Sequence, residues 1–253
     1  MTMQSGEMEQ GGLRRSVKEV LIVALGILCA FGIDAWWDAS REAAETRQFL
    51  VALEAEFSAN VAALRATAAR QHEIVAAGQI LLQLTGPEAG PTAIQAAAEP
   101  IGTLWTPGYQ VMASGALNTL IASGGLARVD DAALRGALGR WPEQLAKLMD
   151  LEDETWRIVT EMLQPRMRQF VPQLEIELAS GFASLPGVRQ EFLDAAPRSS
   201  PFEADYSGLL ADMQFESAVV QRITMTMIVA HVIETETLPL AGEILRGLRA
   251  RIE

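Results

Sequence analysis

Residues 50–84 read LVALEAEFSANVAALRATAARQHEIVAAGQILLQL, and this stretch decides the fold class. It contains no proline and one glycine, Gly78. Its apolar residues return every three or four positions while charged residues take other faces, which is the pattern of an amphipathic helix. The apolar stripe consists of Leu50, Leu53, Phe57, Val61, Leu64, Ala68, Val75 and Leu82. The stretch therefore predicts a long helical rod that ends near Leu84, before Thr85-Gly86-Pro87.

The apolar stripe of this rod needs a partner, either helices of the same chain or a second copy. Because its spacing drifts without a strict heptad, a bundle is favoured over a two-stranded coiled coil. Strong helix formers dominate the other periodic stretches, and no stretch alternates β-branched and aromatic residues. We predict an all-α protein, in which an N-terminal transmembrane helix continues into a long helix that is followed by an antiparallel helical bundle.

Prolines and glycines divide the chain after the rod. Pro91, Pro100 and Pro107 predict that residues 85–108 form a mobile loop with nothing longer than a short helix. A second mobile loop is expected over residues 181–205. Between and after these loops the sequence predicts helices over residues 109–122, 130–138 (capped by Asp130), 142–165 and 206–236, and Pro239 either kinks the last one or begins a final helix to Arg251.

Toward the N-terminus, Val20 to Ile33 form a run without charge that is followed by Trp36 and Trp37. Extended to residues 17–37, a helix spans roughly 31 Å, which matches a hydrocarbon core about 30 Å thick. Lys18 reaches the head groups on one side, and the two tryptophans suit the interface on the other. Gly26 and Ala30 form a small-x-x-x-small pair that permits close packing of a second helix. We predict a single transmembrane helix over residues 17–37.

Three other interpretations of this segment remain open. A cleaved signal peptide also has a short apolar region, and Ala30-Phe31-Gly32 is an acceptable cleavage pattern. A lipoprotein signal would use Cys29, although Leu28 precedes it where a small residue is wanted. A buried helix of a soluble core is the third, since apolar runs of this length are common there.

The balance of basic residues sets the expected orientation. Arg14, Arg15 and Lys18 precede the span, whereas Arg41 and Arg47 follow it. This bias places the N-terminus in the cytoplasm. We expect a bacterial inner-membrane protein with a cytoplasmic tail over residues 1–16 and a periplasmic domain over residues 38–253.

The net charge of -12 across 253 residues disfavours binding to nucleic acid or to anionic lipid head groups. The single cysteine permits no disulfide within the chain. The expected partners are the lipid bilayer and either a second copy of the chain or another membrane protein.

Two stretches resemble an uncharacterised bacterial family of single-span membrane proteins that carry a domain of unknown function. The first is EVLIVALGIL over residues 19–28 with Asp34-Ala35-Trp36-Trp37, and the second is ASGGL over residues 122–126 with Val129-Asp130 and Leu134-Arg135. Asp34-Ala35-Trp36 stands where that family has an amide-rich stretch. The resemblance implies an inner-membrane anchor with an exported helical domain, and it implies no activity, catalytic residue or cofactor.

Motifs for catalysis and cofactor binding are missing from the sequence. It contains no phosphate-binding loop, dinucleotide fingerprint, nucleophile elbow or cysteine pair. His72-Glu73 begins like a zinc-protease motif, but Ala76 stands where the second histidine is needed. His231 and Glu234 share a helix face, and a metal site there would take Glu161 or Asp205 as a further ligand. An ion pair on the helix surface or a hydrogen-bonded core histidine is the favoured interpretation.

Other patterns have structural readings that outweigh functional ones. Glu152-Asp153-Glu154 is read as a solvated face, because consecutive helix residues point in different directions. Met213, Met225 and Met227 are read as core residues and not as copper ligands. Trp105 and Tyr109, in the proline-rich segment, either close the end of the bundle, which is favoured, or form a partner-binding surface.

Three function classes follow from the sequence. The first is a noncatalytic, membrane-tethered interaction or scaffolding protein. The second is an extracytoplasmic sensory or solute-binding module that works with a separate transducer, because the tail over residues 1–16 has no room for an output domain. A metal-dependent hydrolase is the third and weakest.

Overall fold

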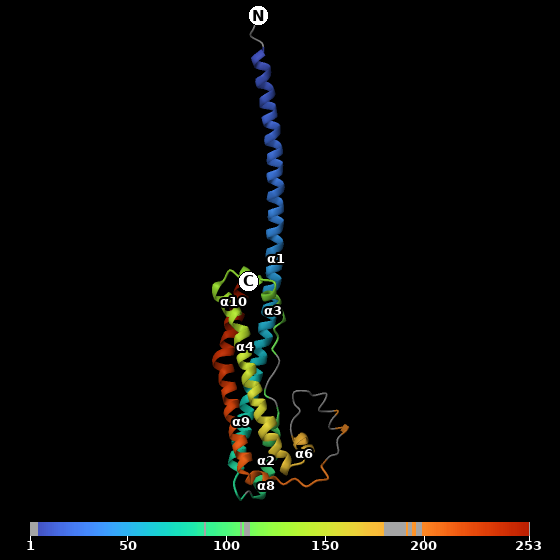
Figure 1. The fold of residues 1–253 in the computed structure, drawn as a ribbon, viewed down its shortest axis with the longest axis vertical. Coiled ribbons are helices and arrows are strands. Elements are labelled where there is room, and N and C mark those ends of the chain that lie inside the picture. Colours follow the sequence, from blue (N-terminus) through green and yellow to red (C-terminus); the bar gives the residue numbers. More distant parts are fainter. Residues whose placement is uncertain are drawn as a thin grey trace. The chain divides into compact units, whose positions relative to one another are not determined.

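The computed structural model describes residues 5–88, 90–106, 108, 112–179, 191, 194–195 and 199–252. Within these ranges, the side chains of residues 5–24, 27, 35, 38–39, 42–43, 91–92, 94 and 179 fall outside the description. The described residues contain helices and no strand, which confirms the predicted all-α class (Figure 1). The chain divides into two units, residues 1–52 and residues 53–251.

The first helix, α1, runs from Ser5 to Leu84 and so belongs to both units. Its end at Leu84 confirms the predicted end of the rod. The amide of Thr85 still donates to the carbonyl oxygen of Leu81, and Gly86 then takes a positive φ of 154° that other residues rarely adopt. The tail expected over residues 1–16 is helical from Ser5 onward.

No helix within the described residues is both long enough and apolar enough to cross a bilayer. Residues 17–24, Ile27 and Ala35 of the expected span have side chains outside the description. The transmembrane helix over residues 17–37 therefore stays a prediction from the sequence.

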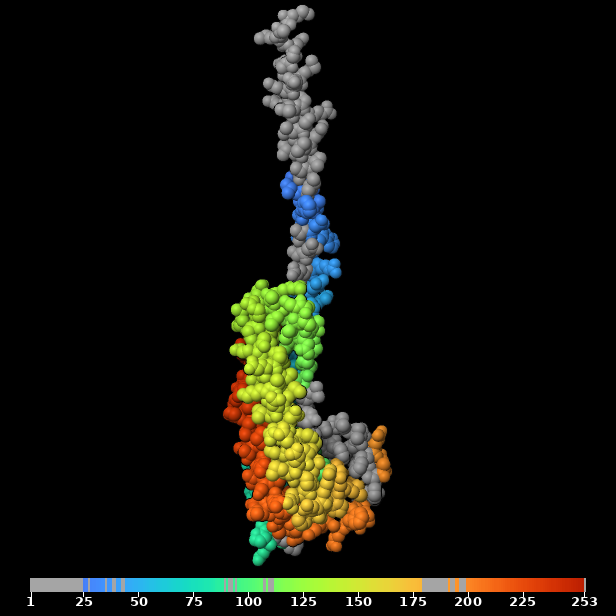
Figure 2. Space-filling model, viewed as in Figure 1, coloured from blue at the N-terminus to red at the C-terminus, as the bar shows by residue number. Residues whose placement is uncertain are grey.

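The second unit is a helical bundle. Its long members are the part of α1 from Leu53 onward, α4 (Ala132–Ile158), α9 (Met213–Val232) and α10 (Leu238–Ile252). Helices α4 and α9 lie side by side along the surface, as the yellow and orange columns of Figure 2 show. The ring of Phe57 on α1 meets the edge of Trp141 on α4 with centroids 5.0 Å apart. The predicted bundle is thereby confirmed.

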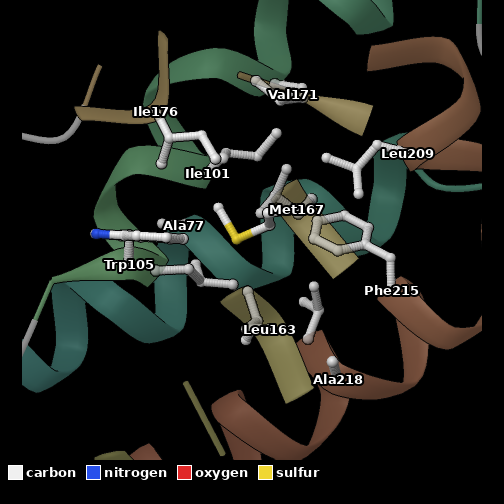
Figure 3. Packing of buried hydrophobic residues seen from close by; sticks show 14 of the residues in the cluster. Ala77, Ile101, Trp105, Leu163, Met167, Val171, Ile176, Leu209, Phe215 and Ala218 are labelled. Carbon is white, nitrogen blue, oxygen red and sulfur yellow. The ribbon is translucent and has the colours of Figure 1, made fainter. Parts of the chain in front are cut away.

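Short helices close one end of the bundle around a second part of the core. These are α2 (Pro91–Trp105), α5 (Gln164–Phe170), α6 (Gln173–Ala179) and α8 (Tyr206–Ala211). Met167 lies in the middle of this part of the core, with Ile101, Leu209 and Phe215 around it (Figure 3). All these side chains are at most 1% exposed, so residues distant in the sequence are fixed against one another.

The prediction of a loop over residues 85–108 is wrong, because α2 occupies most of it. Pro91 stands in the first turn, where a missing N–H costs nothing, and Pro100 lies inside the helix. Ala97, Ile101 and Leu104 are buried at helical spacing. Their burial outweighs the hydrogen bond that Pro100 cannot donate. Most of the second expected loop, over residues 181–205, lies outside the described residues.

Several predicted helix boundaries also differ from the structure, and the helix expected over residues 206–236 is divided at Asp212 into α8 and α9. The helix expected over residues 109–122 is α3, Gly115–Ala122, and a 3-10 turn, Gly125–Arg128, follows it. Asp131, and not Asp130, caps α4 by accepting from the amides of Ala133 and Leu134. Helix α4 then continues through Pro142 without a break, so the helices predicted over residues 130–138 and 142–165 are joined in one helix.

Two π-helical turns interrupt the long helices, and each stands two residues before a proline. The turn η2 covers Val159–Leu163 before Pro165, and η3 covers Ile233–Thr237 before Pro239. A proline ring clashes with the carbonyl four residues earlier, and a widened turn relieves that clash. Pro239 thus acts in both predicted ways, since the helix is disturbed before it and α10 begins at Leu238.

Candidate functional site

Large apolar side chains are exposed along the first unit, within the segment from Leu25 to Trp37. Six of them are between 58% and 67% exposed: Leu25, Leu28, Phe31, Ile33, Trp36 and Trp37. The two tryptophan rings meet edge to face with centroids 6.1 Å apart. Large apolar side chains are rarely exposed together on soluble proteins, and such groups are typical of surfaces that bind lipid or protein.

The predicted helix-packing pair lies in the same segment. Gly26 and Ala30 are exposed, and a Cβ added at Gly26 would meet nothing within 4 Å. Cys29 is exposed and free. The side chain of Lys18 lies outside the described residues, so its predicted place at the membrane interface stays a prediction.

In the second unit, polar side chains of α1 bind the backbone of the segment between α2 and α3. Asn60 donates to the carbonyl oxygen of Ala113 and accepts from its amide, both at 2.8 Å. The carboxylate of Glu56 accepts from the amides of Ala116 and Leu117 at the start of α3. Such an anion suits a helix N-terminus, where amides lack partners. These bonds explain why α3 begins at Gly115 and not near Tyr109.

Gln71 continues this pattern next to the end of α2. Its Nε2 donates to the carbonyl oxygen of Gly108 at 3.0 Å. A Cβ at Gly108 would lie 2.7 Å from that nitrogen, so a larger residue there would displace the amide group of Gln71 from this hydrogen bond. The side-chain oxygen Oε1 of Gln71 is buried without a hydrogen-bond partner.

A buried arginine lies beside this segment. Arg222 on α9 is 1% exposed, and its Nη2 donates to the carbonyl oxygen of Thr106 at 3.1 Å. Its Nε has no hydrogen-bond partner. Burial, together with repulsion from Arg70, lowers the pKa of Arg222 to about 10. Among the described residues no carboxylate forms an ion pair with Arg222, so its charge is uncompensated in a desolvated position.

Arg70 brings a second positive charge to the same place. It donates through Nη2 to the hydroxyl oxygen of Thr106 and through Nη1 to Glu73 at 2.8 Å. The Arg70 side chain is 28% exposed, so it lies at the edge of the core. Two guanidinium groups therefore meet at Thr106, and only the outer one has a carboxylate partner among the described residues.

Two buried hydroxyls without partners stand on the same helices. Thr226 lies one turn along α9 from Arg222, and Thr67 lies one turn along α1 from Gln71. Each such unpaired group costs about 1–3 kcal/mol. The two helices pack closely, since a Cβ on Gly78 would lie 2.4 Å from Cγ1 of Ile223. We refer to Thr67, Gln71, Thr106, Arg222 and Thr226 as the buried polar cluster.

The sequence patterns described above do not predict this cluster, although the position of Arg222 on α9 indicates it. Val219, Thr226 and Val229 share the buried face of α9 with Arg222, at helical spacing. A cationic residue inside an otherwise apolar or hydroxyl stripe departs from the amphipathic pattern. This departure from the amphipathic pattern indicates that Arg222 is a buried charged residue.

The turn η3 is a second polar junction, and it lies between helices. His72 on α1 meets Glu234 at 2.7 Å, while Lys147 on α4 meets Glu236 at 2.6 Å. The lysine, by hydrogen bonding, lowers the pKa of the Glu236 carboxyl. Glu234 therefore pairs with His72, and not with His231 around a metal. In the described part of the chain, no three histidine, cysteine or acidic residues are placed to hold a metal ion.

An open groove of about 660 Å³ runs beside this junction between α4 and α10. The charged residues that line it have both signs: Arg140, Glu143, Lys147 and Glu243. Arg140 and Glu243 pair across the groove at 3.4 Å. Because the charges compensate each other, the groove favours no particular class of ligand.

The acidic run on α4 is only partly the solvated face that was predicted. Glu154 pairs with Arg157 at 2.9 Å near the surface. Glu152 is half-buried, its Oε1 has no hydrogen-bond partner, and burial with repulsion from Asp153 raises its pKa to about 7. Burial thus moves the pKa of a carboxyl near the C-terminal end of α4 toward neutral pH.

Trp105 is 7% exposed and belongs to the core of Figure 3, so it closes the bundle end and offers no surface to a partner. Its ring stacks 5.4 Å from the guanidinium carbon of Arg168. Tyr109 lies outside the described residues. The reading of the methionines as core residues is wrong for Met213 and Met227, which are 73% and 53% exposed.

Comparison with known proteins gives no match, whether with family models, with curated proteins or with solved structures. The resemblance to single-span membrane proteins described above therefore stays a prediction from the sequence.

Proposed function

We propose that this chain is a noncatalytic, membrane-tethered interaction protein, in which the segment around Leu25–Trp37 lies in the bilayer and the helical bundle is held beside it. The observation that carries the proposal is the exposure of Leu28, Phe31 and the tryptophan pair on one short segment of α1. Water is a poor environment for such a segment, while a bilayer accepts the apolar side chains and its interface accepts tryptophan.

The tether is tested by extraction of the full chain from bacterial membranes with alkaline carbonate. We expect the protein to stay with the lipid. Leu28→Arg is expected to release a large fraction, because arginine near the middle of a span costs about 2.5–3.5 kcal/mol. Val51→Arg is the matched control, since Val51 is also an exposed apolar residue of α1 but lies outside the segment. Wild-type protein that washes free, or that begins beyond Gly32, would overturn the proposal.

The predicted orientation has its own test. A reporter fused after Glu253 is expected to be active only when it is of a type that works in the periplasm. Activity of a cytoplasm-specific reporter at the same position would reverse the proposed topology.

We propose a second copy of the chain as the partner, and the open face at Gly26 and Ala30 as the contact inside the bilayer. Small residues let two helix backbones approach, so their side chains set the distance between the helices. Gly26→Leu is expected to abolish cross-linked dimers in membranes. Gly32→Leu is the matched control, because Gly32 is equally open but points to another face of α1. Equal dimer yields in both variants, or monomer alone in the wild type, would exclude this contact.

A solute-binding role is the second candidate function, and the observation that favours it is the uncompensated charge of Arg222 in the bundle. It is compatible with a tether, because a tethered bundle that binds a solute can report it to another membrane protein. We place the metal-dependent hydrolase last, since within the described ranges no three histidine, cysteine or acidic residues are placed to hold a metal ion.

A further inference from the structure

We propose that the buried polar cluster is a binding site for a small oxyanion, a carboxylate or a phosphate, with the Nε of Arg222 as its central donor. The site lies within the second unit and does not depend on the proposed tether. If the tether proposal is wrong, the proposal of an anion site is unaffected. If the anion site does not bind, the result of the carbonate extraction does not change.

The first argument is the charge of Arg222. Arg222 is 1% exposed, its Nη2 donates to one neutral acceptor, the carbonyl oxygen of Thr106, and it has no anionic partner among the described residues. A buried cation without a counter-charge is unfavourable, and replacing it with an apolar residue of similar volume is often neutral or stabilising. An arginine at such a position therefore lowers the stability of the empty protein, and an anionic ligand would supply the missing counter-charge.

The second argument is the surrounding chemistry. Arg70 approaches Thr106 from α1 and adds a second positive charge. Thr226, one turn from Arg222, has a buried hydroxyl without a partner that can donate to an anion. Guanidinium groups and hydroxyls are the donors that proteins use for carboxylate and phosphate.

The third argument is access. The Arg70 side chain is partly exposed, so one of the two cations reaches solvent while the other lies in the core. Because both arginines bond Thr106, Arg70 is the point at which an anion from solvent first meets the cluster. Gln71 bonds Gly108, two residues after Thr106, and its buried acceptor Oε1 matches a ligand that also carries a hydroxyl, such as dihydrogen phosphate or a hydroxycarboxylate.

The experiment is thermal unfolding of the full chain in detergent, with sodium phosphate or sodium acetate titrated against sodium chloride at equal ionic strength. We expect a saturable rise of the midpoint with at least one oxyanion, about 5 °C at a hundredfold excess over Kd. Equilibrium dialysis with labelled phosphate or acetate should give one bound ion per chain. A response to phosphate alone or to acetate alone identifies the ligand type.

Arg222→Met is expected to abolish the rise while leaving the midpoint without added oxyanion equal or higher. Arg65→Met is the matched control, because it removes the same charge from an exposed position of α1, and it should keep the full response. Arg70→Met is the second variant, needed if Arg222→Met does not fold, and should weaken binding about tenfold. A rise of the midpoint that is equally large in sodium chloride would overturn the proposal. An undiminished rise in Arg222→Met would also overturn it, and if that variant does not fold, an undiminished rise in Arg70→Met would do so.

Discussion

At the scale of single residues, buried polar side chains of α1 bond the backbone of Gly108 and Ala113, which lie between α2 and α3. Asn60 satisfies both backbone groups of Ala113, and Gln71 does the same for one group of Gly108. Backbone groups outside helices need such partners wherever water does not reach them, because they are otherwise unpaired. The sequence does not reveal these contacts, since the partners are 53 and 37 residues apart.

Glu152 leads to a prediction on pH dependence. Its pKa rises from 4.5 to about 7 in the folded protein, so folding favours the protonated form. The contribution of the Glu152 carboxyl to stability is fully present at pH values below its unfolded pKa of 4.5. It is lost as the pH rises through the folded pKa of about 7. Glu152→Gln should therefore raise the free energy of unfolding at pH 8 by on the order of 2 kcal/mol and change it little at pH 4, as measured in urea.

Two further variants separate the causes of this behaviour. Asp153→Asn should stabilise the protein at pH 8 by a smaller amount, because it removes the repulsive neighbour but leaves the burial. Glu154→Gln is the control for the loss of a charge beside it, and should lack the pH-dependent gain. The same gain in Glu154→Gln would mean that net charge, and not the burial of Glu152, is the cause.

At the scale of elements, the sequence predicted which stretches are helical better than it predicted where helices break or which face is buried. The end of α1 was readable because Thr85-Gly86-Pro87 is a local signal. The passage of α4 through Pro142 and the existence of α2 were not, because burial of distant side chains decides them.

The pattern of helix α9 explains why Met213 and Met227 were wrongly predicted to be core residues. Met213, Val220 and Met227 recur every seventh residue and look like a core stripe, but they are exposed. The true core stripe contains Phe215, Val219, Arg222, Thr226 and Val229. The polar residues Arg222 and Thr226 interrupt the apolar pattern of this stripe, so the sequence does not predict that the face is buried. Both residues belong to the buried polar cluster.

Substitutions on α9 are expected to follow the observed faces. Met227→Ala should change the free energy of unfolding by less than about 0.5 kcal/mol, because more than half of Met227 is exposed. Val229→Ala, two residues further on, should cost about 2 kcal/mol, because Val229 is 0% exposed. Chemical denaturation of both variants checks the difference, and the reverse order of effects would show that the helix is rotated.

The turn η3 gives a second prediction at this scale. Thr237 is 0% exposed, and its hydroxyl donates to the carbonyl oxygen of Val232 while it accepts from Nε2 of Gln144 at 2.9 Å. Thr237→Val keeps the shape but removes both bonds, so it should cost about 2 kcal/mol. Thr235→Val is the control: the hydroxyl of Thr235 bonds the His231 carbonyl at an exposed site, and the loss should be under about 0.5 kcal/mol.

At the scale of the whole molecule, the two units differ in whether they have an apolar core. The second unit buries a core within its bundle, although Phe202, Met213 and Met227 are exposed on it, whereas the large apolar side chains described in the segment from Leu25 to Trp37 of the first unit are all exposed. The second unit has the buried side chains that cooperative folding requires, and the first has none among the residues whose side chains are described before Leu53. Stability and membrane affinity are therefore expected to belong to different parts of one chain.

Deletion from the N-terminus tests this division. A chain that begins at Ala44 keeps all of residues 53–251 and also Arg47, whose Nη2 donates to the carbonyl oxygen of Ile252. It should dissolve without detergent, unfold in urea in one cooperative transition and no longer bind vesicles. A chain that begins at Ala62 is the matched control, because it lacks Phe57 and Asn60, and thus the contact with Trp141 and both bonds to Ala113. That control should lose the cooperative transition. If the chain from Ala44 is also unfolded, the first unit contributes to the stability of the second; if it still binds vesicles, the membrane contact lies in the bundle.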